Sequence, residues 1–233
     1  MPPPQKKPKK NPETEIQKGN PQPSAGSDFV TITIASNQKF SAHAHMLVYH
    51  SEYFRRAFNS QFQEATTRTF DLSIHATEAT ISAFIKWIYQ KNPKPLEDQI
   101  SCSCGNTTGW KTLFDGLSDR DAIESWFFGD YIQAKEFRND LLHFMFSRDD
   151  FDRTAIVDVW DRIPLESKLR PFLISRFCLN IVELRDVDRL LESLPSTMVL
   201  EVSRYVIRQL KESTDRYSLC KLRFDIKDYL EDM

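Results

Sequence analysis

A glycine-rich stretch is the first group of residues whose types could support chemistry. Residues 105–112 read GNTTGWKT, which is close to the phosphate-binding pattern G-x-x-x-x-G-K-[ST]. That pattern fixes the positions of its glycines and lysine so that backbone amides and the lysine converge on phosphate groups. Here the glycine spacing is one residue short, and Trp110 separates Gly109 from Lys111. We interpret the stretch as a solvated loop.

Cysteine and histidine residues form two close pairs that could ligate a metal. Cys102 and Cys104 form C-x-C, but a tetrahedral zinc site needs four ligands, and the other two cysteines lie far downstream without paired spacing. His43 and His45 stand at a predicted strand-to-helix junction, where they need not share a face. We interpret His43 as a structural imidazole that hydrogen-bonds the neighbouring backbone. We predict neither a metal site nor a cofactor.

The sequence holds no recognised catalytic pattern. It has neither an H-E-x-x-H nor a G-x-S-x-G motif, and no nucleophile stands near a base in a known arrangement. We therefore expect a protein that is not an enzyme.

Composition narrows the class of protein further. Of 233 residues, 40% are hydrophobic and 12% aromatic, which is enough for a sizeable core, and no run approaches a membrane helix of about twenty apolar residues. The net charge is -2 and the body after residue 27 is mildly acidic, which argues against a nucleic-acid surface. Four cysteines without an apolar signal segment favour a reducing compartment. We expect an intracellular protein that binds neither nucleic acid nor membranes.

The chain divides into three predicted parts. Residues 1–27 hold seven of the twelve prolines and no aromatic residue, so we predict a disordered basic tail that buries too little surface to order. Its Lys6 to Lys10 run is typical of a nuclear import signal and equally of a solvated tail, so cytoplasmic and nuclear locations both stay open. Residues 28–148 form the predicted domain, with a loop-like insertion at about 91–120, and residues 149–233 form a helical extension.

Alternating apolar residues predict a small sheet at the start of this domain. The FVTITI sequence after Asp28 places its valine and isoleucines on one face, and a polar turn leads to a second strand at Phe40. A third strand is predicted through Phe70 and Leu72. A hairpin followed by a later strand is the simplest arrangement.

Helical periodicity follows the hairpin. Ser51 is placed as an N-cap before a helix whose aromatic stripe includes Phe54, and Thr77 is placed to cap a helix that ends near residue 92, before a proline. Two more helices are predicted around residues 123–131 and 137–145, and four in the extension.

Several of these residues together resemble the BTB/POZ family. The stretch 40–58 resembles its F-x-A-H-x-x-x-L-x-x-x-S-x-x-F-x-x-x-F core, residues 87–89 resemble its helix-ending aromatic-I-Y element, and residues 128–139 resemble a form common in fungal members. The matching residues span about 28–146. They are Asp28, Phe40, His43, Leu47, Ser51, Phe54, Phe58, Trp87, Tyr89, Gly129, Asp130, Phe137 and Asn139.

The resemblance implies a fold and a general function. It implies an α+β domain with a three-stranded sheet flanked by about five helices, followed here by an all-α extension. It also implies a non-enzymatic protein-interaction module whose relatives form dimers or larger assemblies through the first strand and the early helices. In this sequence that surface would draw on Phe29, Val30, Met46, Tyr49 and Tyr53.

One residue departs from the family pattern. Many members place a lysine or arginine one position after the motif histidine, facing an aspartate like Asp28, but this sequence has Ala44 there. Because a buried carboxylate without a partner is costly, we expect Asp28 to be exposed or paired elsewhere. The dimer geometry of the transcriptional relatives is therefore open here.

A short motif suggests a specific partner. Phe62-Gln63-Glu64 resembles the hydrophobic-x-Glu element with which some members dock on a cullin ubiquitin-ligase scaffold, and the same triplet could merely close a loop over the core. Two functions stay open: a self-associating substrate adaptor for a cullin-type ubiquitin ligase, and an oligomeric scaffold in nuclear or signalling assemblies without ligase activity.

Overall fold

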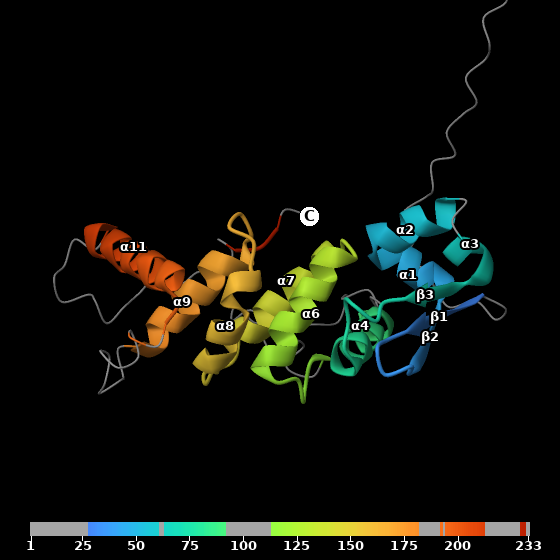
Figure 1. Ribbon diagram of the computed structural model, residues 1–233, viewed down its shortest axis with the longest axis horizontal. Helices are drawn as coiled ribbons and strands as arrows, with labels where there is room; N and C mark the ends of the chain where they lie inside the picture. The colour runs from blue at the N-terminus through green and yellow to red at the C-terminus, as the bar shows by residue number, and fades with distance from the viewer. Residues whose placement is uncertain are drawn as a thin grey trace, which may run out of the picture.

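The computed structural model describes residues 28–60, 63–91, 113–181, 192, 194–212 and 229–231 (Figure 1). The predicted disordered tail, Phe62 and most of the predicted insertion, including both of its cysteines, lie outside these residues. Figure 1 shows the sheet and helices α1–α4 at one end, α6 and α7 in the middle, and α8, α9 and α11 at the other end.

A three-stranded sheet opens the domain, as predicted. Strands β1 and β2 are antiparallel, with Val30 opposite Ala42, whereas β3 runs parallel to β1, with Ile32 opposite Phe70. The strand order is β2-β1-β3, so β2 is an edge strand of this sheet. The alternating face predicted from the sequence is buried, because Val30, Ile32 and Ile34 all lie in the core. The strands are β1 Phe29–Thr33, β2 Lys39–His43 and β3 Thr69–Asp71.

Four helices surround the sheet, and side chains cap two of them as predicted. The Ser51 hydroxyl oxygen accepts a hydrogen bond from the Phe54 amide at 3.3 Å, and the Thr77 oxygen accepts one from Thr80 at the same distance. The Ser51 hydroxyl also donates to the carbonyl of Ile132 at 2.6 Å, which ties this cap to a later helix. The helices are α1 Ala44–His50, α2 Glu52–Asn59, α3 Gln63–Thr67 and α4 Glu78–Gln90.

Two packed helices follow, α6 Asp119–Tyr131 and α7 Lys135–Phe146. They approach closely at Gly129, where a Cβ atom would lie 2.8 Å from Cγ of Arg138 and 3.0 Å from Cδ1 of Phe137. Phe137 is fully buried, and its ring lies 5.2 Å from those of Phe84 and Trp87 on α4. The glycine and phenylalanine of the motif are therefore packing residues of the core.

The extension is helical, and it continues the same hydrophobic core. Its elements are α8 Arg153–Val159, the short 3-10 helix η1 Trp160–Arg162, α9 Leu169–Ile181 and α11 Ser196–Glu212. The buried carboxylate of Asp119 at the start of α6 accepts a hydrogen bond from the Asp152 amide at 2.7 Å and lies 2.8 Å from Nε of Arg148. The boundary predicted at 148/149 stays a prediction, since buried side chains run on across it.

Arg170 holds the helices of the extension together. Its guanidinium group lies 4.1 Å from the ring centroid of Trp160, donates to Glu201 on α11 at 2.8 Å and donates to the carbonyl of Ile163 at 2.6 Å. The buried guanidinium group therefore has an aromatic ring, a carboxylate and a backbone carbonyl as partners.

Candidate protein-interaction surfaces

The motif histidine lies where β2 ends, and its partner differs from the predicted one. The Tyr89 hydroxyl oxygen lies 2.6 Å from Nδ1 of His43 and accepts a hydrogen bond from the His43 amide at 2.9 Å. We predicted a bond from the imidazole to neighbouring backbone, and this was wrong. The bond instead joins two motif elements that are 46 residues apart.

An exposed aromatic ring covers this histidine. The Phe29 ring lies 4.3 Å from the His43 ring and is 60% exposed. Tyr49 on α1 is also exposed, at 49%. These two residues are the exposed members of the five that we predicted for self-association.

The other three predicted self-association residues are placed differently. Val30 is 0% exposed and Met46 is 1% exposed, so both are core residues of the protomer and cannot form a docking surface. Their burial follows from strand alternation and from the apolar face of α1. Tyr53 is partly buried against Phe54 and Tyr131.

Asp28 has both of the properties expected for it. Its side chain is 65% exposed, and its carboxylate lies 2.8 Å from a guanidinium nitrogen of Arg68, which precedes β3. The amide of Ala44 donates to the Asp28 carbonyl at 2.9 Å. Arg68 thus supplies the positive charge that is absent from position 44, and no buried carboxylate is stranded.

A row of aromatic rings crosses the surface beside α3. The Tyr53 and Tyr131 ring centroids are 5.2 Å apart, and the Tyr131 ring stacks on His75 at 3.6 Å with an interplanar angle of 14°. Burial, a hydrogen bond to Tyr131 and the nearby negative charge of Glu64 raise the pKa of the Tyr53 hydroxyl. Ile74, next to His75, is 90% exposed. We call Glu64, Tyr53, Tyr131, His75 and Ile74 the tyrosine row.

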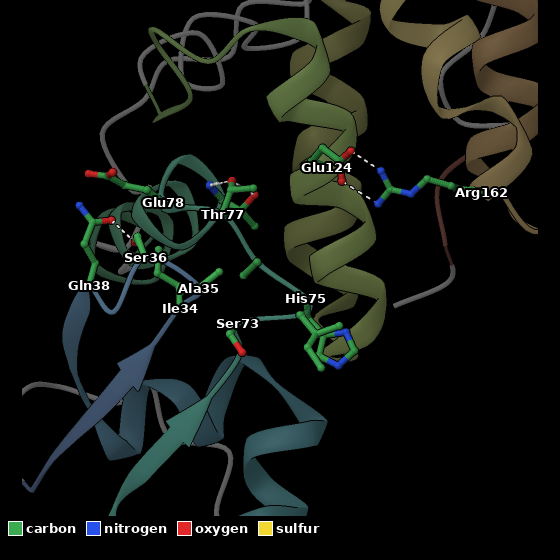
Figure 2. Close-up of a pocket in the computed structure, with 13 residues that line it drawn as sticks. Ile34, Ala35, Ser36, Gln38, Ser73, His75, Thr77, Glu78, Glu124 and Arg162 are labelled. Atoms are coloured by element: carbon green, nitrogen blue, oxygen red, sulfur yellow. Dashed lines mark hydrogen bonds and ion pairs between the residues drawn. The ribbon is translucent and has the colours of Figure 1, made fainter.

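A groove continues from the end of this row (Figure 2). It has a volume of about 400 Å³ and lies between the β1–β2 turn, the β3–α4 loop and α6. Glu124 and Arg162 line one side, where two hydrogen bonds join the guanidinium group to the carboxylate, one of them 2.8 Å long. Ile74 and His75, from the β3–α4 loop, and Glu78, at the start of α4, also line the groove. A groove of mixed polarity beside exposed apolar residues suits the side chains of another polypeptide.

Of the two side chains expected to contact a cullin, only that of Glu64 can be placed. Glu64 lies exposed in the first turn of α3, whereas Phe62 lies outside the described residues. Glu64 lies near Tyr53 in the tyrosine row, and this neighbourhood was not predicted from the sequence. The stacked pair of His75 and Tyr131 joins residues 56 positions apart in the chain, so local periodicity carries no signal for it.

A buried charged cluster lies between α1, α4 and α7 and was also missed. The Asp140 carboxylate accepts a hydrogen bond from Nε1 of Trp87 at 2.7 Å and lies 2.7 Å from Nζ of Lys91, which also lies 3.2 Å from Glu136. Burial raises the pKa of Asp140 in spite of the lysine. Burial lowers the pKa of the nearby His50 to about 4. The motif tryptophan is therefore half of a hydrogen-bonded pair inside the fold.

Two further motif residues make polar contacts: Asp130 accepts a hydrogen bond from Arg138, and Asn139 donates one to the backbone of Glu231. Leu47 is buried, and Phe40 and Phe58 pack partly buried against the core. His43 and His45 have ring centroids 5.5 Å apart, but no group of three metal-ligating side chains occurs among the described residues. No helix in the described part of the chain is long and apolar enough to cross a membrane.

Comparison with known proteins gives one match. The family model of the BTB/POZ domain matches residues 20–101, which include the sheet, α1–α4 and the start of the predicted insertion. Neither the search of curated proteins nor that of solved structures gave a match. The residues that resemble the fungal form lie beyond residue 101, so that form stays a prediction. Together, the matched model and the sheet with its helices show that this chain carries a BTB/POZ domain, which is a protein–protein interaction module.

Proposed function

We propose that this protein is not an enzyme but a self-associating BTB/POZ protein that acts as a substrate adaptor for a cullin-type ubiquitin ligase. The observation that carries the proposal is the tyrosine row, in which the exposed Ile74 and Glu64 flank stacked aromatic rings. Such a surface offers an apolar anchor within a polar rim, which is the usual composition of a docking site.

The position of Glu64 supports a cullin as the occupant. The hydrophobic-x-Glu triplet leads into α3, and its glutamate is exposed on the same surface as the row. An apolar side chain that enters a groove on the partner would carry most of the affinity, and a carboxylate beside it would fix the orientation through hydrogen bonds.

Co-purification with a cullin tests this surface. We expect the wild-type chain to retain a cullin. The double change Phe62→Ala with Glu64→Ala should weaken cullin binding at least tenfold, and so should Ile74→Glu alone. Leu165→Glu is the matched control, because Leu165 is also an exposed aliphatic residue, at 79%, but lies in the extension. Failure of the wild-type chain to bind any cullin would contradict the adaptor function.

Self-association is proposed through the exposed pair Phe29 and Tyr49. Phe29 begins β1 and Tyr49 lies on α1, and the neighbouring β2 is an edge strand with backbone groups that a second copy can pair with. A stable dimer should bury about 1,600 Å² in total. Light scattering during gel filtration should give the mass of a dimer or larger assembly, and Phe29→Glu with Tyr49→Glu should give a monomer. A wild-type chain that is a strict monomer would contradict this part of the proposal.

The alternative function is an oligomeric scaffold in nuclear or signalling assemblies without ligase activity. It is favoured by the exposed Phe29 and Tyr49, which can support assembly without a cullin. A wild-type chain that oligomerises but retains no cullin would select it. The proposed nuclear location, from Lys6 to Lys10, has its own test: a reporter fused to residues 1–27 should accumulate in the nucleus, and a cytoplasmic reporter would contradict it.

A further inference from the structure

Residues 229–231 lie against α7 and α9, two helices that come much earlier in the sequence. The Asn139 carboxamide makes two hydrogen bonds to the backbone of Glu231: Nδ2 donates to the carbonyl at 3.0 Å, and the Glu231 amide donates to Oδ1 at 2.9 Å. A carboxamide that uses both groups on one residue recognises an extended backbone and sets its register, because it copies the pairing of a neighbouring strand.

The side chain of the same residue is recognised as an acid. Arg138 donates to the carboxylate of Glu231 from one guanidinium nitrogen and to that of Asp130 from another. The Arg138 side chain is only 10% exposed and lies over the Trp126 ring, 5.4 Å from its centroid. A buried guanidinium group in this position selects a carboxylate over a neutral side chain.

An aromatic contact completes the recognition. The Tyr229 ring meets the Phe172 ring of α9 edge to face, with centroids 5.8 Å apart, and Leu230 packs partly buried against the hydrophobic core. Three successive residues are therefore each recognised by a different chemistry, in the order aromatic, aliphatic and acidic.

The side chains that contact residues 229–231 stand on α7 and α9, two helices packed into the hydrophobic core. If Glu231 leaves, Arg138 keeps its ion pair with Asp130 and its position over Trp126, so no buried charge is stranded. The arrangement is that of a preformed site from which its occupant can be exchanged.

We infer that Asn139, Arg138 and Phe172 form a peptide-binding site for a partner segment of the form aromatic–leucine–acidic, which residues 229–231 occupy within the chain. An in-chain occupant acts at an effective concentration on the order of millimolar, so a partner must displace it or bind through a second contact. The site would give this BTB/POZ protein a way to capture a target. It does not depend on cullin binding or on self-association.

The test uses the full chain with the site vacated by Tyr229→Ala, Leu230→Ala and Glu231→Pro, which remove the ring, the aliphatic side chain, the carboxylate and the backbone amide that donates to Asn139. The probe is a fluorescent peptide of residues 226–233, IKDYLEDM, followed by anisotropy. We expect saturable binding to the vacated chain and at least tenfold weaker binding to wild type, where the site is filled. Adding Asn139→Ala to the vacated chain should weaken binding about tenfold or more, because two hydrogen bonds are lost. A scrambled peptide is the control.

Two outcomes would overturn the inference. One is no binding to a vacated chain whose urea unfolding matches that of wild type. The other is a fall of the vacated chain from dimer to monomer in light scattering, which would show that the occupant is a second copy.

If the vacated chain does not fold, amide hydrogen exchange in wild type decides. Peptide at several millimolar should speed exchange at residue 231, and unchanged exchange would overturn the inference.

Discussion

The Tyr89 hydroxyl oxygen contacts both the backbone amide and the imidazole of His43, at 2.9 and 2.6 Å, and so joins the end of β2 to the end of α4. The oxygen accepts from the amide, and its own hydrogen is then available to Nδ1 of a neutral imidazole. One atom thus satisfies two groups of the histidine that marks the family motif.

Removal of that oxygen should destabilise the domain. Tyr89→Phe leaves the His43 amide and Nδ1 without this partner in a half-buried place, so we expect a loss of about 1–3 kcal/mol in the free energy of unfolding. Urea unfolding followed by circular dichroism measures it. Leu165→Ala at an exposed position is the control and should change the free energy by less than about 0.5 kcal/mol. Equal effects of the two changes would show that the bond is not stabilising.

Gly129→Ala should also destabilise the domain, although alanine has a higher helix propensity than glycine. At an ordinary helix site this change is stabilising by up to about 1 kcal/mol. Here the new Cβ would lie 2.8 Å from Cγ of Arg138, so the buried side chains of α7 must shift, and we expect a net loss of about 1–3 kcal/mol in the free energy of unfolding. Thermal unfolding tests the sign, with Lys135→Ala on the exposed part of α7 as control. A raised melting temperature would contradict the close approach.

His50 should make stability depend on pH. Burial lowers its pKa to about 4 in the folded protein, while the unfolded chain has the ordinary value near 6.5. Between these values the unfolded chain binds more protons, so stability is full above about pH 6.5 and falls as the pH drops toward 4. The positive charge of Lys91 adds to the lowering and Glu136 opposes it.

His50→Gln should remove part of this slope. Between pH 7 and pH 4 the free energy of unfolding should fall by about 2 kcal/mol less in the variant than in wild type, a figure that allows for solvent screening at a partly buried site. The pKa values of His45 and His143 are also lowered by burial. These two groups should therefore make stability depend on pH in both proteins. Identical pH profiles for the two proteins would show that His50 is not buried in its neutral form.

Two aspartates of the domain should respond very differently to removal. Asp140→Ala leaves Nε1 of Trp87 and one contact of Lys91 unsatisfied in the interior, and we expect a loss of about 3–5 kcal/mol. Asp28→Ala removes an exposed ion pair with Arg68 and should cost less than about 1 kcal/mol. Urea unfolding of both variants measures the contrast. Similar losses would mean that burial does not control these charges.

Local patterns predicted most of the elements, because strand alternation, helix periodicity and capping residues act over a few positions. The sheet face after Asp28, the Ser51 and Thr77 caps and the helices around Phe54 and Phe137 are all present. The same alternation already buries Val30, and the apolar face of α1 buries Met46, so their assignment to a docking surface contradicted the pattern that places them in the core.

The contacts that build the surfaces could not be predicted in this way. Tyr89 bonds His43 across 46 residues and Asn139 bonds Glu231 across 92, and no period in the sequence marks either pair. Each pair forms only because segments far apart in the sequence pack together in the fold. The spacing of the motif identified these residues as important, but their contact partners depend on how the elements pack in three dimensions.

Both borders of the stretch between residues 91 and 114 are held by α7. Lys91 pairs with Glu136 and Asp140 on that helix, and the Phe114 ring lies 5.9 and 5.5 Å from those of Phe137 and Phe144. Since the entropy of closing a loop grows only as the logarithm of its length, the distance between two fixed anchors matters more than what joins them. The two anchors should therefore stay in place on α7 when an epitope or a fluorescent reporter is inserted between them.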